Sequence, residues 1–201
     1  MPLVDKEYHI AIFASGNGSN AEKIIAYFQD HPSIHVSLIL SNKPDAYVLK
    51  RAEEHIINCA LFTKSQMEKD LGVSDVLASN NIDFIILAGF LLLIPPYLIS
   101  NYPNRILNIH PSLLPKHGGK GMYGKHVHKS VKESGETKTG MTIHFVNEHY
   151  DQGTIIKQYS TSIAPEEDAE DIAAKVSILE HRHYPEVIEE VIELYDFSKN
   201  F

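Results

Sequence analysis

Short runs of almost uninterrupted apolar residues alternate with amphipathic segments along the first half of the chain, and this pattern limits the folds open to it. The runs Ile10 to Ala14 and Phe84 to Ala88 contain no polar residue. Strands of this kind are typical of a parallel sheet covered by helices on both faces. Between them, Ala21 to Phe28 has apolar residues at helical spacing. The alternation predicts an α/β fold with a doubly wound, mostly parallel sheet.

Later segments add an antiparallel pair and a long helix to this prediction. Thr139 to Asn147 alternates apolar and polar residues, and Gly153 to Thr161 predicts a further strand after a short connection. Two strands joined so closely are expected to pair antiparallel. Glu166 to Tyr195 predicts a long C-terminal helix that Pro185 kinks or divides. A helix is also expected at 65–80, with a possible break at Gly72.

Length and composition predict one soluble domain spanning residues 1–201. The formal net charge of -8 argues against a nucleic-acid partner, which would require a basic surface. The single cysteine, Cys59, excludes an internal disulfide and a cysteine-based zinc site, and is expected to be a small core residue. The polar start, Met1 to Lys6, predicts no signal peptide. The longest apolar stretch, Ile85 to Pro96, is too short for a membrane span, so a cytoplasmic location is expected.

A glycine-containing turn follows the first predicted strand and opens the first helix. Glycines let the backbone approach an anion, and a helix N-terminus presents free N–H groups to it, so the turn predicts a phosphate site. The spacing Gly16-x-Gly18-x-x-Ala21 also fits a dinucleotide-binding module, but the second strand ends in Ser41-Asn42-Lys43 without the expected acid. A phosphomonoester is therefore the better guest, and a merely tight connection remains the alternative. The predicted cradle is Gly16, Asn17, Gly18, Ser19 and Asn20.

A second polar cluster comes from the stretch Arg105 to Pro115, which opens as a strand. Asn108 and His110 are separated by one residue, so they point to the same face of that strand. Chemistry is commonly found past the carboxyl end of a strand in an open α/β sheet. The alternative is that both are ordinary, satisfied polar residues of the sheet.

The unbroken sequence from Leu107 to Pro115, Leu-Asn-Ile-His-Pro-Ser-Leu-Leu-Pro, resembles the signature of the folate-dependent formyltransferases. Other matches fall in the family's order and cover nearly the whole chain: the turn Ser15 to Asn20, Leu87 to Phe90, Asp151 before Gly153, and Glu180 to Pro185. The resemblance implies a Rossmann-like formyltransferase fold. With the glycine turn and the small size, it also implies the branch of the family that formylates glycinamide ribonucleotide in purine biosynthesis.

The resemblance implies a reaction and roles for named residues. The amine of glycinamide ribonucleotide would attack the formyl carbon of 10-formyltetrahydrofolate, the co-substrate, and release tetrahydrofolate. Asn108 would donate to the oxyanion, His110 would donate to the same oxygen or act as an acid, and Asp151 would orient His110. The N-terminal half would bind phosphate and ribose, and the C-terminal half would bind folate and carry catalysis. The substrate-binding residues would be the cradle with Glu180 and Lys64, and the folate-binding residues Leu91, Leu92, Ile94, Val146, Asn147 and Asp151.

Several alternatives and departures remain. A formyltetrahydrofolate deformylase, a hydrolase, has a similar catalytic core but usually an added regulatory domain, and transfer to a charged tRNA would need a second domain and a basic surface. No metal is expected, because the histidines His126, His128 and His144 lack cysteine ligands or a clear carboxylate partner. Leu92 stands where the family often has arginine, and the glycine-rich loop 116–125 is longer than usual; it either covers the substrate or decorates the surface. A monomer or homodimer is expected, with no membrane contact.

Overall fold

The computed structural model describes residues 6–199; the other residues of the predicted 1–201 domain, including most of its polar start, lie outside the described range. The strands are β1 (Tyr8–Phe13), β2 (Ile34–Ser41), β3 (Asn58–Leu61), β4 (Phe84–Leu87), β5 (Ile106–His110), β6 (Lys138–Phe145) and β7 (Ile155–Ser162). The helices are α1 (Ser19–Phe28), α2 (Tyr47–Glu54), α3 (Lys64–Glu68), α4 (Val73–Ser79), α5 (Pro96–Asn101), α6 (Lys125–Glu133) and α7 (Ala169–Lys199).

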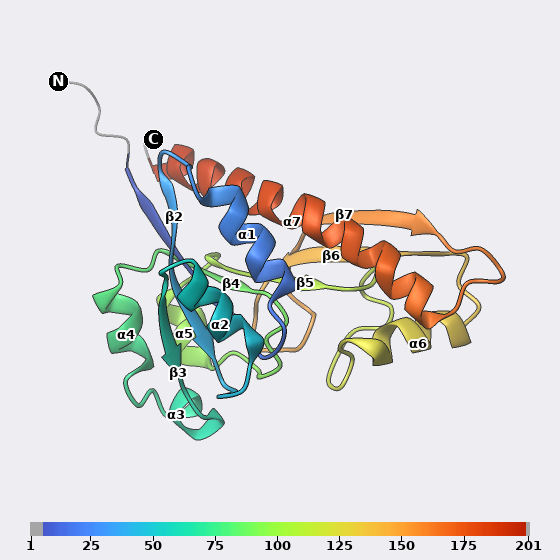
Figure 1. The fold of residues 1–201 in the computed structure, drawn as a ribbon, viewed down its shortest axis with the longest axis horizontal. Coiled ribbons are helices and arrows are strands. Elements are labelled where there is room, and N and C mark those ends of the chain that lie inside the picture. The colour runs from blue at the N-terminus through green and yellow to red at the C-terminus, as the bar shows by residue number, and fades with distance from the viewer. Residues whose placement is uncertain (1–5, 200–201) are drawn as a thin grey trace.

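The described strands form a single seven-stranded sheet in the order β3-β2-β1-β4-β5-β6-β7 (Figure 1). β1 lies between β2 and β4, and every pairing from β3 to β5 is parallel. Apolar side chains of α1, α2, α6 and α7 pack in one core against one face of the sheet. Those of α3, α4 and α5 pack in a second core against the other. The predicted doubly wound, mostly parallel fold is confirmed.

The antiparallel part of the sheet is larger than the sequence predicted. β6 and β7 pair antiparallel, as expected, but β6 also pairs antiparallel with β5. This register places Asn108 opposite His144 and His110 opposite Thr142. Because β6 lies inside the sheet under α7, its residues from Thr139 to His144 are buried on both faces. The alternation in its sequence is therefore not an alternation of buried and exposed positions.

Two predicted helix interruptions have different outcomes. Gly72 does separate α3 from α4, with a left-handed φ of 89° that favours glycine. Pro185, in contrast, lies inside α7, which continues for 31 residues. The adjacent Tyr184 is fully buried, and its hydroxyl donates to the carbonyls of Leu87 at 3.0 Å and Leu107 at 3.3 Å. This packing keeps α7 continuous across Pro185, although a proline inside an isolated helix costs about 3 kcal/mol.

The prediction that Cys59 is a core residue is wrong. Cys59 lies in β3, the edge strand next to β2, and is exposed. Its strand is only four residues long and largely exposed, so an apolar sequence does not place it in the core. Among the described helices, none has the length and apolar content needed to cross a membrane.

Candidate active site

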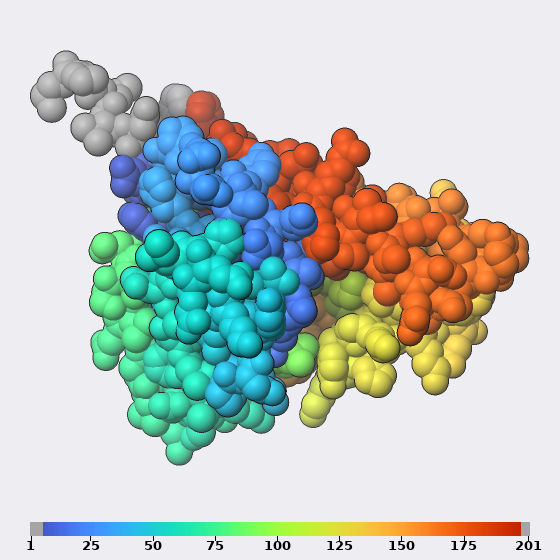
Figure 2. Space-filling view, in the orientation of Figure 1, coloured from blue at the N-terminus to red at the C-terminus, as the bar shows by residue number. Residues whose placement is uncertain are grey.

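A cavity of about 490 Å³ opens at the carboxyl ends of β1 and β4. From these neighbouring strands the chain continues toward opposite edges of the sheet. Open α/β sheets bind ligands at such a switch point. The two loops that follow these strands are joined: the Ser15 N–H donates to the Gly89 carbonyl at 3.0 Å, and the Leu91 N–H donates to Ser15 Oγ at 3.0 Å. In Figure 2, the yellow segment with α6 stands apart from the blue and cyan N-terminal segments, with a hollow between them.

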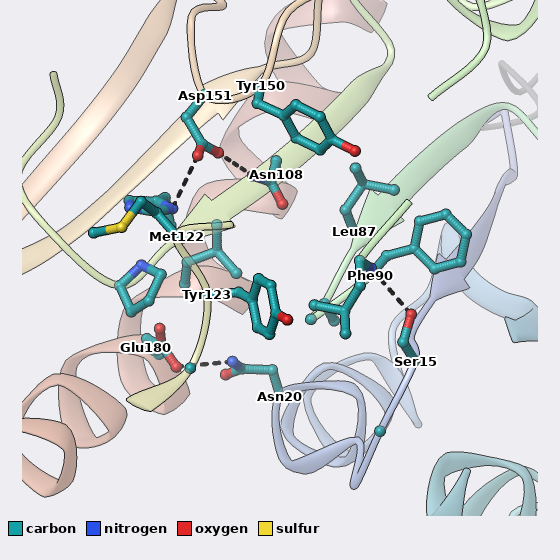
Figure 3. Close-up of a pocket in the computed structure, with 18 of the residues that line it drawn as sticks. Ser15, Asn20, Leu87, Phe90, Asn108, Met122, Tyr123, Tyr150, Asp151 and Glu180 are labelled. Carbon is teal, nitrogen blue, oxygen red and sulfur yellow. Dashed lines mark hydrogen bonds and ion pairs between the residues drawn. The ribbon is translucent and has the colours of Figure 1, made fainter. Parts of the chain in front are cut away.

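Asn108, His110 and Asp151 meet on the wall of this cavity, so the structure brings together the three predicted catalytic side chains. Asn108 and His110 come from the end of β5, and Asp151 comes from the connection between β6 and β7 (Figure 3). His110 Nδ1 lies 3.4 Å from Asp151 Oδ2, and Asn108 Nδ2 lies 3.5 Å from Asp151 Oδ1. Asp151 has a left-handed φ of 57°, a conformation that aspartate and asparagine tolerate better than most residues.

His144 fixes the orientation of the Asn108 amide, a role that the sequence did not indicate. His144 Nδ1 is 2.8 Å from the Phe145 carbonyl, which can only accept a hydrogen bond. In the neutral ring, Nδ1 therefore carries the proton and Nε2 accepts. Asn108 Nδ2 donates to this Nε2 at 3.0 Å. Its second hydrogen makes only the long contact with Asp151, which leaves it available for a ligand oxygen.

The glycine-rich loop is attached to the side chains of His110 and Asp151 by its backbone. His110 Nε2 is 2.8 Å from the His117 carbonyl, and the Gly119 N–H donates to Asp151 Oδ2 at 2.8 Å. Gly119, Gly121, Met122, Tyr123 and Gly124 line the cavity. In Figure 3, Tyr123 lies between the side chains of Asn108 and Asn20. Of the two expectations for the loop, the structure therefore supports the one in which it covers the site.

Burial and charge act in opposite directions on His110 and Asp151. Burial lowers the pKa of His110 below its ordinary value, against the carboxylate of Asp151 and the His117 carbonyl, which favour the protonated ring. Burial alone would raise the pKa of Asp151. The nearby His144 ring, the charge of His110 and the Gly119 N–H outweigh that effect and hold the pKa of Asp151 below its ordinary value.

The turn at 16–20 forms one end of the same cavity, and Glu180 of α7 faces it. No backbone acceptor among residues 6–199 takes up the N–H groups of this turn. Gly18 has a φ of 76°, and a Cβ added there would lie 2.6 Å from Val48 Cγ2. Asn20 Nδ2 donates to Glu180 Oε2 at 2.9 Å. Burial raises the pKa of Glu180, while the bond from Asn20 opposes that shift.

The other end of the cavity has an apolar wall. Val146 and the loop after β4 supply it, with Ile94 buried and Leu92 half-buried. Leu91 is more exposed, and Asn147 and Tyr150 add polar groups at the margin. All of the predicted folate-binding residues line this cavity: Leu91, Leu92, Ile94, Val146, Asn147 and Asp151.

Lys64 is the predicted site residue that the structure does not bring to the main cavity. It lies at the start of α3 on a second, smaller hollow, which it shares with Leu92, Lys120 and Tyr150. Its Nζ is 3.5 Å from Glu68 Oε1, and the side chain is 69% exposed.

The described residues contain no group of three histidine, cysteine or acidic side chains placed to hold a metal ion.

A model of the formyl transferase family matches residues 8–188. The chain belongs to the formyl transferase family. A curated family member, the chloroplastic phosphoribosylglycinamide formyltransferase of Arabidopsis thaliana, is 43% identical over 191 residues. That match covers 92% of this chain and 65% of the plant protein, so the chain spans less than two thirds of that relative. The phosphoribosylglycinamide formyltransferase of Haemophilus influenzae is 37% identical, over 89% of this chain and 84% of that protein.

Solved structures in the formyl transferase family have the same fold. The crystal structure of phosphoribosylglycinamide formyltransferase from Bacillus halodurans matches with a TM-score of 0.83 and 36% identity. The match covers 92% of this chain and 95% of that one. The family signature therefore corresponds to the region where β5 carries Asn108 and His110 into the cavity.

Proposed function

We propose that this chain transfers the formyl group of 10-formyltetrahydrofolate to the amine of glycinamide ribonucleotide, a step of purine biosynthesis. One observation carries the proposal: the cluster of Asn108, His110 and Asp151 lies between the glycine turn at 16–20 and an apolar wall in one cavity. A formyl donor on the wall and a phosphorylated amine on the turn would meet at the cluster. The names of the relatives support the same reaction.

The phosphate of the amine substrate would be bound by Gly16, Asn17, Gly18, Ser19 and Asn20. Their free N–H groups and the positive end of α1 favour an anion. Glu180 would receive the ribose hydroxyls, because its carboxyl group faces the same end of the cavity. Lys64 lines the second hollow and not the main cavity, so its exposed amine would at most meet an anionic group leaving the folate end.

The pteridine ring would lie against Leu91, Leu92, Ile94, Val146 and Asn147, where flat apolar surface and backbone groups are combined. A cavity of about 490 Å³ is within the usual range for a small-molecule site. The absence of an arginine at Leu92 leaves the tail of the folate without a charged partner at that position. The N-terminal half of the fold would thus bind phosphate, and the C-terminal half would bind folate and carry catalysis.

The chemistry requires stabilisation of one oxygen and movement of one proton. When the amine attacks the formyl carbon, the carbonyl oxygen becomes negative. The free hydrogen of the Asn108 amide would donate to it, and so would Nδ1 of the His110 imidazolium, whose contact with Asp151 at 3.4 Å is long, while Nε2 stays on the His117 carbonyl. Asp151 would hold His110 in its protonated form and accept the proton that the amine loses. Collapse of the intermediate re-forms the carbonyl and breaks the bond from the formyl carbon to N10 of the folate, which leaves with a proton donated by His110. The proton held by Asp151 then passes to His110, which returns the pair to its starting state.

We further propose a cytoplasmic protein that acts on glycinamide ribonucleotide and folate, as a monomer or homodimer, without a nucleic-acid or membrane partner. The formal net charge of -8 supports the absence of a nucleic-acid partner. The relatives reported above give no support to the deformylase alternative.

One assay tests the proposal against that alternative. The protein is mixed with 10-formyltetrahydrofolate, with and without glycinamide ribonucleotide, and the absorbance of the deformylated folate is followed. We expect turnover only when the amine is present, with one formylated product for each folate released. Equal rates with and without the amine would identify a hydrolase instead. A control with unphosphorylated glycinamide riboside is expected to react poorly, since it cannot use the turn.

A further inference from the structure

The glycine turn is held from outside the cavity by one arginine of α2. Arg51 Nε donates to the Asn17 carbonyl at 2.9 Å, and Arg51 Nη2 donates to Asn17 Oδ1 at 3.1 Å. Its third donor, Nη1, lies 2.9 Å from Glu22 Oε2 in the first turn of α1. A single guanidinium group therefore clamps Asn17 and joins the turn to both helices.

The clamp has a direct consequence for the N–H groups in the cavity. In a planar trans peptide, the carbonyl and the following N–H point in opposite directions. Holding the Asn17 carbonyl toward Arg51 therefore directs the Gly18 N–H away from α2. Gly18 lines the cavity, and its N–H has no backbone acceptor among the described residues. The clamp thus keeps a donor aimed at the place where an anion would bind.

The charges around the turn favour a geometric role for Arg51 over a purely electrostatic one. The described residues that line the cavity include the acids Asp151 and Glu180 but no lysine or arginine. Arg51 is not free to serve as the missing cation, since Glu22 shares its charge. The hydrogen bond with His55, and then that with Arg51, hold the pKa of Glu22 below its ordinary value, so this acid stays ionised.

We propose that Arg51 is a positioning residue for the phosphate end of the amine substrate, acting through Asn17. The inference rests on the proposed function in one respect, that the ligand at the turn is a sugar phosphate. A lysine could keep the charge but not the planar fork that holds both oxygens of Asn17. The fork, and not the charge alone, is therefore what the site requires.

Steady-state kinetics of four variants test this role. We expect Arg51→Met and Arg51→Lys each to raise the KM for glycinamide ribonucleotide about tenfold or more, the effect of losing roughly one good hydrogen bond to a charged group. The kcat and the KM for the folate should stay within about twofold of wild type, since Arg51 touches neither the cluster nor the apolar wall. A purely structural defect would lower kcat as well.

Two neighbouring residues supply matched controls. Lys50→Met removes a cation of the same helix that lies 5.7 Å from the Tyr47 ring, against 5.0 Å for Arg51. Among the described residues, Lys50 makes no hydrogen bond or ion pair with the turn. Glu22→Gln removes the ion pair but leaves both bonds to Asn17. Both controls should keep the wild-type KM values. The inference is overturned if Arg51→Lys restores the wild-type KM, or if Glu22→Gln raises it as much as Arg51→Met does.

A binding measurement separates failure of this inference from failure of the proposed function. Ribose 5-phosphate and ribose are titrated calorimetrically into wild type, Arg51→Lys and Glu22→Gln, with thermal unfolding as a check of the fold. We expect only Arg51→Lys to bind ribose 5-phosphate about tenfold more weakly. Equal binding by wild type and Arg51→Lys would refute the clamp even if wild type formylates the amine. Weakened binding together with an inactive wild type would refute the proposed reaction and leave the clamp supported.

Discussion

His110 is placed between two hydrogen-bond acceptors, and this determines how its ring can be used. Nε2 faces the His117 carbonyl at 2.8 Å, and Nδ1 faces the Asp151 carboxylate at 3.4 Å. A neutral imidazole has one N–H, so it can satisfy only one of these acceptors, whereas the imidazolium satisfies both. Burial opposes that charge. The protonation state of His110 therefore depends on Asp151 more than on the chain's other acids.

The first prediction tests that dependence with Asp151→Asn. The change removes the carboxylate but keeps the size of the side chain, and asparagine tolerates the left-handed φ of 57°. Asp151 raises the pKa of His110, so its loss should lower that pKa further below the ordinary value of 6.5. If activity needs the imidazolium, then on raising the pH the variant should lose activity at a lower pH than wild type does. The measurement is an NMR titration of the His110 ring in both proteins; an unchanged pKa would rule out this role for Asp151.

A second prediction concerns the two residues of β5. Asn108→Ala and His110→Ala should each reduce kcat by about two orders of magnitude or more, the usual effect of removing an oxyanion donor. His126→Ala is the matched control, since His126 contacts the Tyr123 ring but does not line the cavity. Circular dichroism should show that all three variants fold. Turnover within a few-fold of wild type for Asn108→Ala would mean that His110 alone stabilises the oxyanion.

At the level of residues, the sequence revealed the part of the site that is local. Asn108 and His110 are two positions apart on a strand, and that spacing alone predicts a shared face. His144 could not be found in this way, because its contact with Asn108 depends on the antiparallel pairing of β5 with β6. The His117 carbonyl and the Gly119 N–H are main-chain groups, which leave no trace in the choice of side chain.

At the level of elements, close approach between α2 and the glycine turn dictates one residue. A side chain at Gly18 would meet both a left-handed φ of 76° and the Val48 side chain at 2.6 Å. Gly16, two residues earlier, has no atom within 4 Å of an added Cβ and no positive φ. The two glycines are therefore required to different degrees, although the sequence shows them as one motif.

The third prediction compares these two glycines. Gly18→Ala should lower the free energy of unfolding by about 1–2 kcal/mol from the left-handed backbone alone, with an added cost from displacing Val48. Gly16→Ala should change it by less than about 0.5 kcal/mol. Urea unfolding of both variants and wild type measures the difference. Equal stability of the two variants would show that the turn can move away from α2.

The sequence predicted the end of a helix correctly where the end depends on one residue, and wrongly where it depends on tertiary packing. Gly72 separates α3 from α4 because its left-handed φ is a property of the backbone at that residue. The effect of Pro185 depends on what the rest of α7 packs against, and the buried residues Tyr184, Val187 and Ile188 hold the helix on the sheet across it. Pattern alone cannot weigh that packing against the cost of a proline.

At the level of the whole molecule, the order of the strands places the site. The alternation of strands and helices in the sequence predicted a parallel sheet. The position of β1 between β2 and β4 sets the point from which the chain extends toward opposite edges of that sheet. The cavity opens there, and it collects residues from the loop after β1, from β4 and β5, from the glycine-rich loop and from α7. Such assembly depends on long-range contacts that a single sequence does not report.

The fourth prediction concerns the pH dependence of stability. Burial lowers the pKa of both His110 and His128. Below their ordinary value of 6.5, the unfolded chain binds protons at these rings that the folded chain excludes, so acidification favours unfolding. The stability that they contribute is present above 6.5 and is lost as the pH falls toward the folded pKa values. The raised pKa of Glu180 acts in the opposite direction, because its proton is bound more tightly in the folded state.

A comparison of variants isolates the histidine contribution. His128→Leu should lose less stability than wild type between about pH 7.5 and about pH 5.5, measured by urea unfolding at each value. Lys129→Met, an exposed neighbour on α6, is the matched control and should follow wild type. If wild type and His128→Leu lose the same stability on acidification, burial of His128 does not oppose its protonation.

In the proposed reaction, the attachment of the glycine-rich loop to His110 and Asp151 would protect the formyl donor from hydrolysis. Two main-chain groups at the base of this loop are the partners of His110 and Asp151. If the loop lifts to admit a substrate, both bonds are broken, and the histidine loses the arrangement that supports its charge. An open enzyme with only the donor bound would then be slow toward solvent. Reactivity would return when the loop settles over the second substrate, so little of an energetically expensive one-carbon unit would be wasted.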